Sequence, residues 1–560
     1  MKILLVAINA KYIHSNPAVY SLLANAGEAK GHIEIAEYTI NNYSDDILAD
    51  IYKKAPDLIA MSCYVWNINL IKTLLPELKK VLPKADIWLG GPEVSYYPEM
   101  IMNEYPEVKG VMKGEGENTF AELANLYVKE DDNLKASKKL SQVRGLILKK
   151  DDGSLEYTGV REESDFKDYK FLYEDLADFD NRIIYYESSR GCPFHCAYCL
   201  SATDNKLRFK DIGKVFEELK FFLDNKVKQV KFIDRTFNSS SKHAMAVWQY
   251  ILDNDNGITN FHFEVEADIL SADELNLLAK MRPGLVQLEA GVQSTNKRSL
   301  EAINRHADID KIAKNVKIIK DFGNIHIHLD LIAGLPFEDL ESFKKSFDDV
   351  YKMGADNLQL GFLKLLKGTP IYEKTDEYEI LYKKNANYEV LSTKWLKYKD
   401  ILRLKDVEKV LEIYYNSGQF KNSISYLEGF FDSPFEIYSK LSDYYEKQGQ
   451  FLKHSRIQNY EIIRAFVRDN NICDGEIFDE LLTLDLYLRE NMKKRPDFAK
   501  EMIVQKGKNV HVEIFGRDII KLVKEGIDDK TATAYKFDYE KRNPLTNEAF
   551  LSKEEPDTER

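Results

Sequence analysis

The chain has 560 residues, of which 44% are hydrophobic and 31% charged, and its formal net charge at pH 7 is −13. This length exceeds what one hydrophobic core usually serves, so about three domains are expected. The acidic balance argues against a general nucleic-acid surface or an anionic membrane as partner, and neither is expected.

Cysteine usage and the start of the chain bear on its compartment. Five cysteines in so long a chain do not make a disulfide framework, which favours the reducing cytoplasm. The apolar run at the N-terminus stops after Ile8 without a cleavage site, so a buried strand is expected there and not a signal peptide. No window reaches the roughly 20 apolar residues of a membrane helix.

The first part of the chain, residues 1–135, alternates short apolar runs with amphipathic segments. Strands are predicted at 2–8, 33–40, 57–65 and 85–91, and helices at 17–31 and 69–83. This rhythm predicts a doubly wound parallel sheet, a Rossmann-like domain with helices on both faces. Ligands in such sheets bind beyond the carboxyl ends of the strands.

A linker with a hairpin is expected over residues 136–180, with Asp152-Gly153 as the hairpin turn. A second alternating block follows at 181–380 and predicts a partial (β/α)6 TIM-type barrel with its site at the C-terminal strand ends. Its six strands are predicted at 183–191, 227–237, 261–268, 285–294, 325–336 and 357–365. Residues 381–560 have helical spacing and predict a mostly α-helical domain of unknown role.

Three of the five cysteines lie in the stretch "RGCPFHCAYC", at Cys192, Cys196 and Cys199, directly after a predicted strand. Thiolates bind zinc or iron–sulfur clusters, and ligand number decides between them. A structural zinc site needs four ligands, and no second cysteine pair occurs in the chain. His195 stays open as a fourth ligand, although its place inside the triplet would strain a tetrahedral site. A disulfide, or a chance grouping of the three thiols, also stays open.

The CxxxCxxC spacing, with an aromatic residue before the last cysteine, resembles the signature of the radical S-adenosylmethionine (SAM) family. The resemblance implies a 4Fe–4S cluster on Cys192, Cys196 and Cys199 with one iron left open for SAM. It implies reductive cleavage of SAM to a 5′-deoxyadenosyl radical, with an external reductant such as flavodoxin or ferredoxin. It also implies an aromatic contact to the SAM adenine, which falls on Tyr198.

The later predicted strands supply further SAM candidates. Asp234 stands where the family usually has a Gly-Gly-Glu segment and is the candidate acceptor for the SAM amino group, with pairing to an arginine as the alternative. Glu266 lies on one strand face with Glu264 and Asp268 and is the candidate for the ribose hydroxyls, with a structural ion pair as the alternative. Gly291 would allow close backbone approach, and Gln293 would bond SAM or substrate.

The N-terminal domain has a second resemblance. A methylthiotransferase domain would bring three more cysteines, but only Cys63 precedes the triplet. The segments "MSCY" and "LGGPEVSYYPE" are similar to those of the cobalamin-binding radical SAM family. This implies cobalamin contacts from Ser62 and from residues 90–93, which are Gly90, Gly91, Pro92 and Glu93.

The loop after the first strand departs from the histidine-ligating cobalamin pattern. His14 lacks the aspartate and glycine of an Asp-x-His-x-x-Gly loop, so cobalt without a protein histidine ligand is expected. A sheet that has lost cobalamin binding is the alternative.

Together these resemblances imply a radical SAM enzyme with cobalamin as second cofactor, methylating an unactivated carbon of an unknown substrate. Two other outcomes stay open. One is a non-methylating rearrangement, cyclisation or oxidoreduction on the same scaffold. The other is an iron–sulfur electron-transfer or sensor protein that does not cleave SAM.

Overall fold

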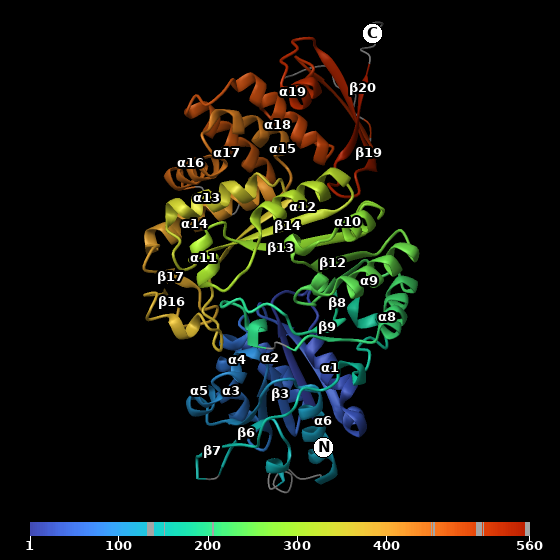
Figure 1. Cartoon of the computed structure of the whole chain (residues 1–560), viewed down its shortest axis with the longest axis vertical. Helices are drawn as coiled ribbons and strands as arrows, with labels where there is room; N and C mark the ends of the chain where they lie inside the picture. The colour runs from blue at the N-terminus through green and yellow to red at the C-terminus, as the bar shows by residue number, and fades with distance from the viewer. Residues whose placement is uncertain are drawn as a thin grey trace. The chain divides into compact units, whose positions relative to one another are not determined.

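The computed structural model describes residues 1–130, 139–150, 152–203, 206–449, 451, 454–499, 507 and 509–554, with Asp168 described by its backbone alone (Figure 1). The first residues of the predicted linker, 136–138, therefore lie outside the described residues. The chain divides into two compact units. The first comprises Met1–Val265, Ile303–Arg305 and Leu363–Leu391, and the second comprises Glu266–Ala302, His306–Phe362 and Ser392–Arg560.

The first unit begins with a seven-stranded sheet in the order β2-β1-β3-β4-β5-β6-β7 (Figure 1). The first five strands pair in parallel, and β6 and β7 close the sheet antiparallel. The strands are β1 (Ile3–Asn9), β2 (Ile33–Thr39), β3 (Leu58–Ser62), β4 (Asp86–Gly90), β5 (Val108–Met112), β6 (Leu146–Lys149) and β7 (Leu155–Tyr157).

Helices cover both faces of this sheet because its strands are apolar on both sides. Alternate residues of β1 enter different cores: Leu4, Val6 and Ile8 join one, while Ile3, Leu5 and Ala7 join the other. The first core includes α2 (Ser44–Lys54), α3 (Ile68–Val81) and α5 (Pro98–Glu104), and the second includes α1 (Pro17–Asn25) and α6 (Glu117–Glu130). The short helix α4 (Pro92–Ser95) follows β4 directly. The predicted doubly wound parallel sheet is confirmed.

The rest of the first unit carries the cysteine loop. Three parallel strands, β8 (Ile184–Tyr186), β11 (Gln229–Phe232) and β12 (Asn260–Glu264), alternate with α8 (Ile212–Asp224) and α9 (Ser241–Asp253). A two-stranded antiparallel ribbon of β9 (Ser189–Arg190) and β10 (Arg208–Phe209) brackets the cysteines. The segment 363–391, with β16 (Leu381–Tyr382) and β17 (Val390–Ser392), returns to this unit.

The second unit contains the other three predicted barrel strands, which pair in parallel. They are β13 (Val286–Gln293), β14 (His326–Ala333) and β15 (Asn357–Phe362). Their helices are α10 (Ala272–Leu278), α11 (Lys297–Ala302), α12 (Ile309–Phe322) and α13 (Leu340–Tyr351). All six predicted strands are therefore present, in accord with the predicted radical SAM fold class.

The C-terminal region is mostly helical, as predicted. Its helices are α14 (Tyr398–Leu411), α15 (Lys421–Leu427), α16 (Pro434–Lys447), α17 (Arg456–Asp469), α18 (Gly475–Arg489) and α19 (Ile519–Glu525). It also contains an antiparallel sheet of β18 (Val510–Phe515), β19 (Thr533–Arg542) and β20 (Ala549–Glu554), which the sequence pattern does not predict. Among the described residues, no helix is long and apolar enough to cross a membrane.

Candidate functional site

The three cysteines occupy the loop between β9 and β10, and none of them is in a disulfide. Cys192 and Cys196 are buried, and Cys199 is half-buried. The loop is held by its backbone, because the Ala197 N–H donates to the Ile303 carbonyl at 2.7 Å and the Ala197 carbonyl accepts from Ile371 at 3.0 Å. The cysteines are thus presented by a braced loop at the end of the unit's parallel strands.

Polar neighbours reach two of the three sulfurs. The Arg305 guanidinium donates to Cys196 Sγ at 3.8 Å, and Thr236 Oγ1 lies 3.5 Å from Cys192 Sγ. A guanidinium beside a sulfur favours its thiolate form, which is the form that binds metal. Within the described part of the chain, no three His, Cys, Asp or Glu side chains converge to hold a single metal ion. A cluster binds its thiolates on separate iron atoms, so its cysteines need not converge on one point.

His195 and Tyr198 differ in their surroundings although both lie inside the cysteine triplet. The His195 side chain is exposed, and the residue is tied down through its carbonyl, which accepts from Asn304 at 3.0 Å. Tyr198 is half-buried, and burial raises the pKa of its phenol. The role of Tyr198 as a SAM neighbour stays a prediction.

Asp234 is fully buried and faces serines, not the arginines considered as its alternative partners. Its Oδ1 accepts from the hydroxyls of Ser188 and Ser189, each at 2.6 Å, and its Oδ2 accepts from the Ser188 N–H at 2.9 Å. Burial raises the pKa of Asp234 to about 6, against the effect of these hydrogen bonds. In the described structure Asp234 braces the strand that leads into the cysteine loop, and its contact with SAM stays a prediction.

A cavity of about 690 Å³ opens at the carboxyl edge of the seven-stranded sheet. It is lined by Ser62, Gly90, Gly91 and Pro92, which are four of the five predicted cobalamin contacts. Tyr185 of β8, Arg190 of β9 and Ile233, which directly follows β11, also line it. One cavity therefore has walls from both the N-terminal sheet and the cysteine-bearing region.

Gly91 shapes the wall of this cavity. Its backbone has φ 105° and ψ 172°, a region that only glycine occupies readily. A Cβ at Gly91 would lie 2.6 Å from the Cys63 carbonyl oxygen. The Ser62 hydroxyl on the neighbouring strand accepts from Asn16 Nδ2 at 3.2 Å. The edge is thus a close-packed backbone surface with one hydroxyl, which fits a flat amide-bearing ligand.

Glu93 does not line the cavity, unlike the other predicted cobalamin contacts. Its buried carboxylate lies 3.4 Å from Lys367 Nζ and accepts a hydrogen bond from the Tyr388 hydroxyl. Both partners belong to the returning segment 363–391, which thereby binds the sheet edge. Sequence reasoning missed this pairing because the partners are about 280 residues away from Glu93 in the chain.

His14 is not among the residues that line the cavity. Its Nδ1 lies 2.6 Å from the Tyr185 hydroxyl, and burial lowers the pKa of the imidazole, with Lys11 and Lys231 adding to the effect. The expectation that His14 is no cobalt ligand stays a prediction.

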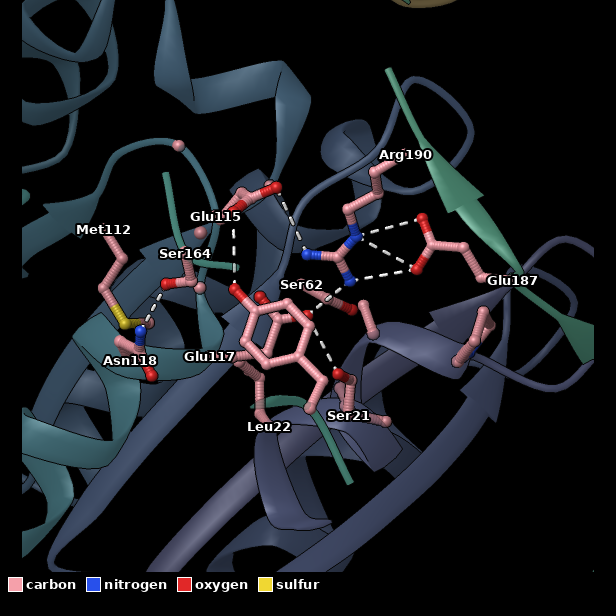
Figure 2. A pocket seen from close by; sticks show the side chains of 18 of the residues that line it. Ser21, Leu22, Ser62, Met112, Glu115, Glu117, Asn118, Ser164, Glu187 and Arg190 are labelled. Atoms are coloured by element: carbon pink, nitrogen blue, oxygen red, sulfur yellow. Dashed lines mark hydrogen bonds and ion pairs between the residues drawn. The ribbon is translucent and has the colours of Figure 1, made fainter. Parts of the chain in front are cut away.

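An ionic cluster at the cavity mouth was missed by the sequence analysis. Figure 2 shows the Arg190 guanidinium between the carboxylates of Glu115, Glu117 and Glu187. Arg208 binds Glu115 from the other side with two hydrogen bonds of 2.7 and 3.0 Å. Burial alone would raise the pKa of Glu115, but Arg208 and Arg190 hold this pKa below its usual range. In the sequence, the segment "GVMKGEGENTFAEL" resembles the cobalamin-binding radical SAM family, with a simple helix start at "GEGE" as the alternative, and neither interpretation predicts these arginine partners.

The second unit holds the remaining predicted SAM residues. β12 ends at Glu264, so the strand alternation expected to align Glu264, Glu266 and Asp268 on one face stops before Glu266. Glu266 is buried and precedes a 3₁₀ turn, Ala267–Ile269. Its contact with the SAM ribose stays a prediction.

Gly291 and Gln293 meet at a bulge near the end of β13. The strand register shifts between them, and Gln293 has φ 71°. A Cβ on Gly291 would lie 2.0 Å from Gln293 Nε2, so the glutamine folds over the glycine. Gln293 Oε1 is buried and has no hydrogen-bond partner among the described residues. A buried acceptor of this kind fits a donor group of a ligand, as predicted for SAM or substrate.

Comparison with known proteins assigns the two halves of this site. A B12 binding domain model matches residues 3–124, and a radical SAM superfamily model matches residues 186–350. A model of a protein family of unknown function, DUF4080, matches residues 376–543. The chain thus joins a B12-binding domain to a radical SAM domain and ends in a domain without assigned function.

The chain is also similar to individual proteins. The uncharacterised methyltransferase PH0819 of Pyrococcus horikoshii is 26% identical over 396 residues, which cover 69% of this chain and 82% of that protein. The cobalamin-dependent radical SAM methyltransferase TokK of Streptomyces tokunonensis is 25% identical over 58% of this chain, and the match spans only 49% of TokK. The solved structure of the cobalamin-dependent SAM radical enzyme OxsB with aqua-cobalamin has a TM-score of 0.60 at 15% identity, covering 86% of this chain and 78% of OxsB.

The fold and the two domain matches define a radical SAM enzyme with a second cofactor domain. The chain carries the two domains that characterise radical SAM proteins with an N-terminal cobalamin-binding domain. Its cofactors are a 4Fe–4S cluster, SAM and cobalamin. The residues fit them: three cysteines outside any disulfide on a braced loop for the cluster, and a glycine-walled cavity at the sheet edge for cobalamin.

Proposed function

We propose that this protein transfers a methyl group to an unactivated carbon of its substrate. The cavity that carries this proposal has walls from both the cobalamin-binding sheet and the radical SAM region. When bound, the cluster with SAM supplies a carbon radical by hydrogen abstraction, and cobalamin supplies the methyl group. The methyltransferase names of PH0819 and TokK support the same outcome.

The chain's own residues prepare this reaction by holding and shielding the two sites. Arg305 stabilises the thiolate of Cys196, and the backbone bonds of Ala197 keep the cysteine loop in place. The Gly91 wall shapes the neighbouring cavity, whose lining also includes apolar residues such as Leu22, Met112 and Ile233.

We also propose that the electron comes from an external carrier such as flavodoxin or ferredoxin, in the reducing cytoplasm. The free state of all five cysteines suits such a compartment. Neither a nucleic acid nor a membrane is part of this proposal.

The fate of a labelled methyl group tests the proposed function. Anaerobically reconstituted protein would be given reductant, trideuteromethyl-SAM and a small-molecule extract of cells that carry the protein. Methylation predicts 5′-deoxyadenosine, S-adenosylhomocysteine and a metabolite bearing the labelled methyl on carbon. Consumption of a metabolite with 5′-deoxyadenosine but without label in any product would contradict methylation and favour a rearrangement or cyclisation.

A further inference from the structure

Arg190 connects the two halves of the site. It is the last residue of β9 and stands two residues before Cys192, while its side chain reaches the start of α6 in the cobalamin-binding domain. Nη2 donates to Glu117 Oε1 at 2.6 Å, and Nη1 lies 3.3 Å from Glu115 Oε1. One side chain therefore links the strand that enters the cysteine loop with the helix that borders the cavity.

The Arg190 guanidinium also contacts residues outside the cobalamin-binding domain. Nε donates to both carboxylate oxygens of Glu187 at 3.0 Å, and the plane lies over the rings of Phe166 and Tyr169, at 5.1 and 4.8 Å from their centroids. Only 16% of the Arg190 side chain is exposed. Guanidinium donors are held in a planar fork, so three carboxylates around one group restrict its position in all directions.

A further hydrogen bond links the Arg190–Glu117 ion pair to the cavity wall. Glu117 Oε1 accepts a second hydrogen bond, from Ser21 Oγ of α1 at 2.9 Å (Figure 2). Both α1 and the start of α6 line the cavity. A displacement of Arg190 would therefore move the cavity wall relative to the cysteine loop.

We propose that Arg190 is a positioning residue that sets the cobalamin cavity at a fixed distance from the cluster loop. This inference rests on the proposed function, because only methyl exchange between SAM and cobalamin needs both sites together. Reductive cleavage of SAM needs the cluster site alone. Loss of the Arg190 contacts therefore uncouples the two activities and leaves both cofactors bound.

Three variants test the role of Arg190. Arg190→Gln removes the guanidinium, but it takes from the buried Glu117 carboxylate its arginine partner, which costs stability. Glu117→Gln is the milder variant, since Arg190 keeps Glu115 and Glu187. Glu122→Gln is the matched control: it weakens the bidentate pair of Glu122 with Arg161 on the same helix α6, and Glu122 is not among the residues that line the cavity.

The readout compares two products of SAM in one anaerobic reaction with reductant and cobalamin. S-adenosylhomocysteine reports methyl transfer from SAM to reduced cobalamin, and 5′-deoxyadenosine reports the cluster site. We expect the ratio of the first product to the second to fall about tenfold or more in Arg190→Gln and less in Glu117→Gln. The ratio is expected to stay unchanged in Glu122→Gln, with iron and cobalamin contents at the wild-type level in all three.

A second readout does not depend on activity. The reduced cluster speeds the spin relaxation of cob(II)alamin by an amount that depends on the distance between the two centres. In the Arg190 and Glu117 variants this enhancement of spin relaxation is expected to be weaker or to be spread over a wider range of distances. Wild-type coupling and wild-type product ratio in Glu117→Gln and in folded Arg190→Gln would overturn the proposal. Failure of the wild-type protein to retain cobalamin would instead overturn the proposed function.

Discussion

The Gly90-Gly91 edge allows a quantitative test of how the cavity wall is built. Replacing Gly91 by alanine imposes two penalties at once. Its φ of 105° and ψ of 172° lie in a region that is nearly closed to other residues, and its added Cβ would lie 2.6 Å from the Cys63 carbonyl oxygen. The clash is with backbone, so no side-chain rotation relieves it.

The neighbouring glycines separate the two penalties. A Cβ at Gly114 would meet nothing within 4 Å, but φ there is 83°, so Gly114→Ala carries strain alone, about 1–2 kcal/mol. A Cβ at Gly90 would lie 3.5 Å from Met112 Cε, an ordinary contact, so Gly90→Ala is expected to change stability by less than about 1 kcal/mol. Gly91→Ala combines strain and clash and is expected to cost about 3 kcal/mol or more.

Urea unfolding of the cofactor-free proteins measures these differences, and visible absorbance after desalting measures retained cobalamin. The expected order of stability is wild type and Gly90→Ala, then Gly114→Ala, then Gly91→Ala. Cobalamin retention should fall about tenfold or more in Gly91→Ala, because a shifted wall no longer matches the ligand. Wild-type stability together with full cobalamin retention in Gly91→Ala would refute this account of the wall.

Three further predictions concern single side chains. Because His14 is not among the residues that line the cavity, His14→Ala should leave the electron paramagnetic resonance spectrum of bound cob(II)alamin unchanged, and a lost nitrogen coupling would show that His14 does ligate cobalt. Burial raises the pKa of Glu338 to about 7 from its ordinary 4.5, so the folded state binds this proton more tightly than the unfolded state. The stabilisation is complete below the pKa of Glu338 in the unfolded state and is lost as the pH rises through its pKa in the folded state, a fall of about 3 kcal/mol in the free energy of unfolding. Glu338→Gln should therefore remove the fall of the urea midpoint with rising pH. An unaltered fall in this variant would assign the pH dependence to other groups. Finally, Cys196→Ala should lose cluster iron, whereas His195→Ala, at an exposed side chain, should keep it; iron loss in His195→Ala would make the histidine a ligand.

The cysteine loop and the first sheet were predictable because their signals are local. Cys192, Cys196 and Cys199 stand within eight residues, and the buried runs of β1, β3 and β4 are short, apolar and bounded by helices. Parallel strands buried on both faces read as continuous hydrophobic runs, so four of them and their direction followed from the chain itself, whereas the fifth parallel strand, β5, was not predicted.

The polar contacts of the site were not predictable in the same way. Arg190 finds Glu115 and Glu117 about 73 residues away, and Glu93 finds Lys367 about 274 residues away, so only the folded chain shows these pairs. The expected strand through Asp268 failed because the alternation of acidic and apolar residues continues past Glu264 into a 3₁₀ turn. By contrast, β18 carried a readable signal, since Val510–Phe515 alternates in the sequence, but the surrounding helical pattern concealed it.

The central claim is that one chain holds a SAM-cleaving cluster beside bound cobalamin. The most direct measurement is the yield of 5′-deoxyadenosine from SAM and reductant in cobalamin-loaded protein, compared with Cys199→Ala loaded in the same way. The account predicts steady formation by the wild-type protein and none by the variant, with cobalamin absorbance equal in both. No 5′-deoxyadenosine from wild-type protein with an intact cluster, or equal amounts from both proteins, would contradict it.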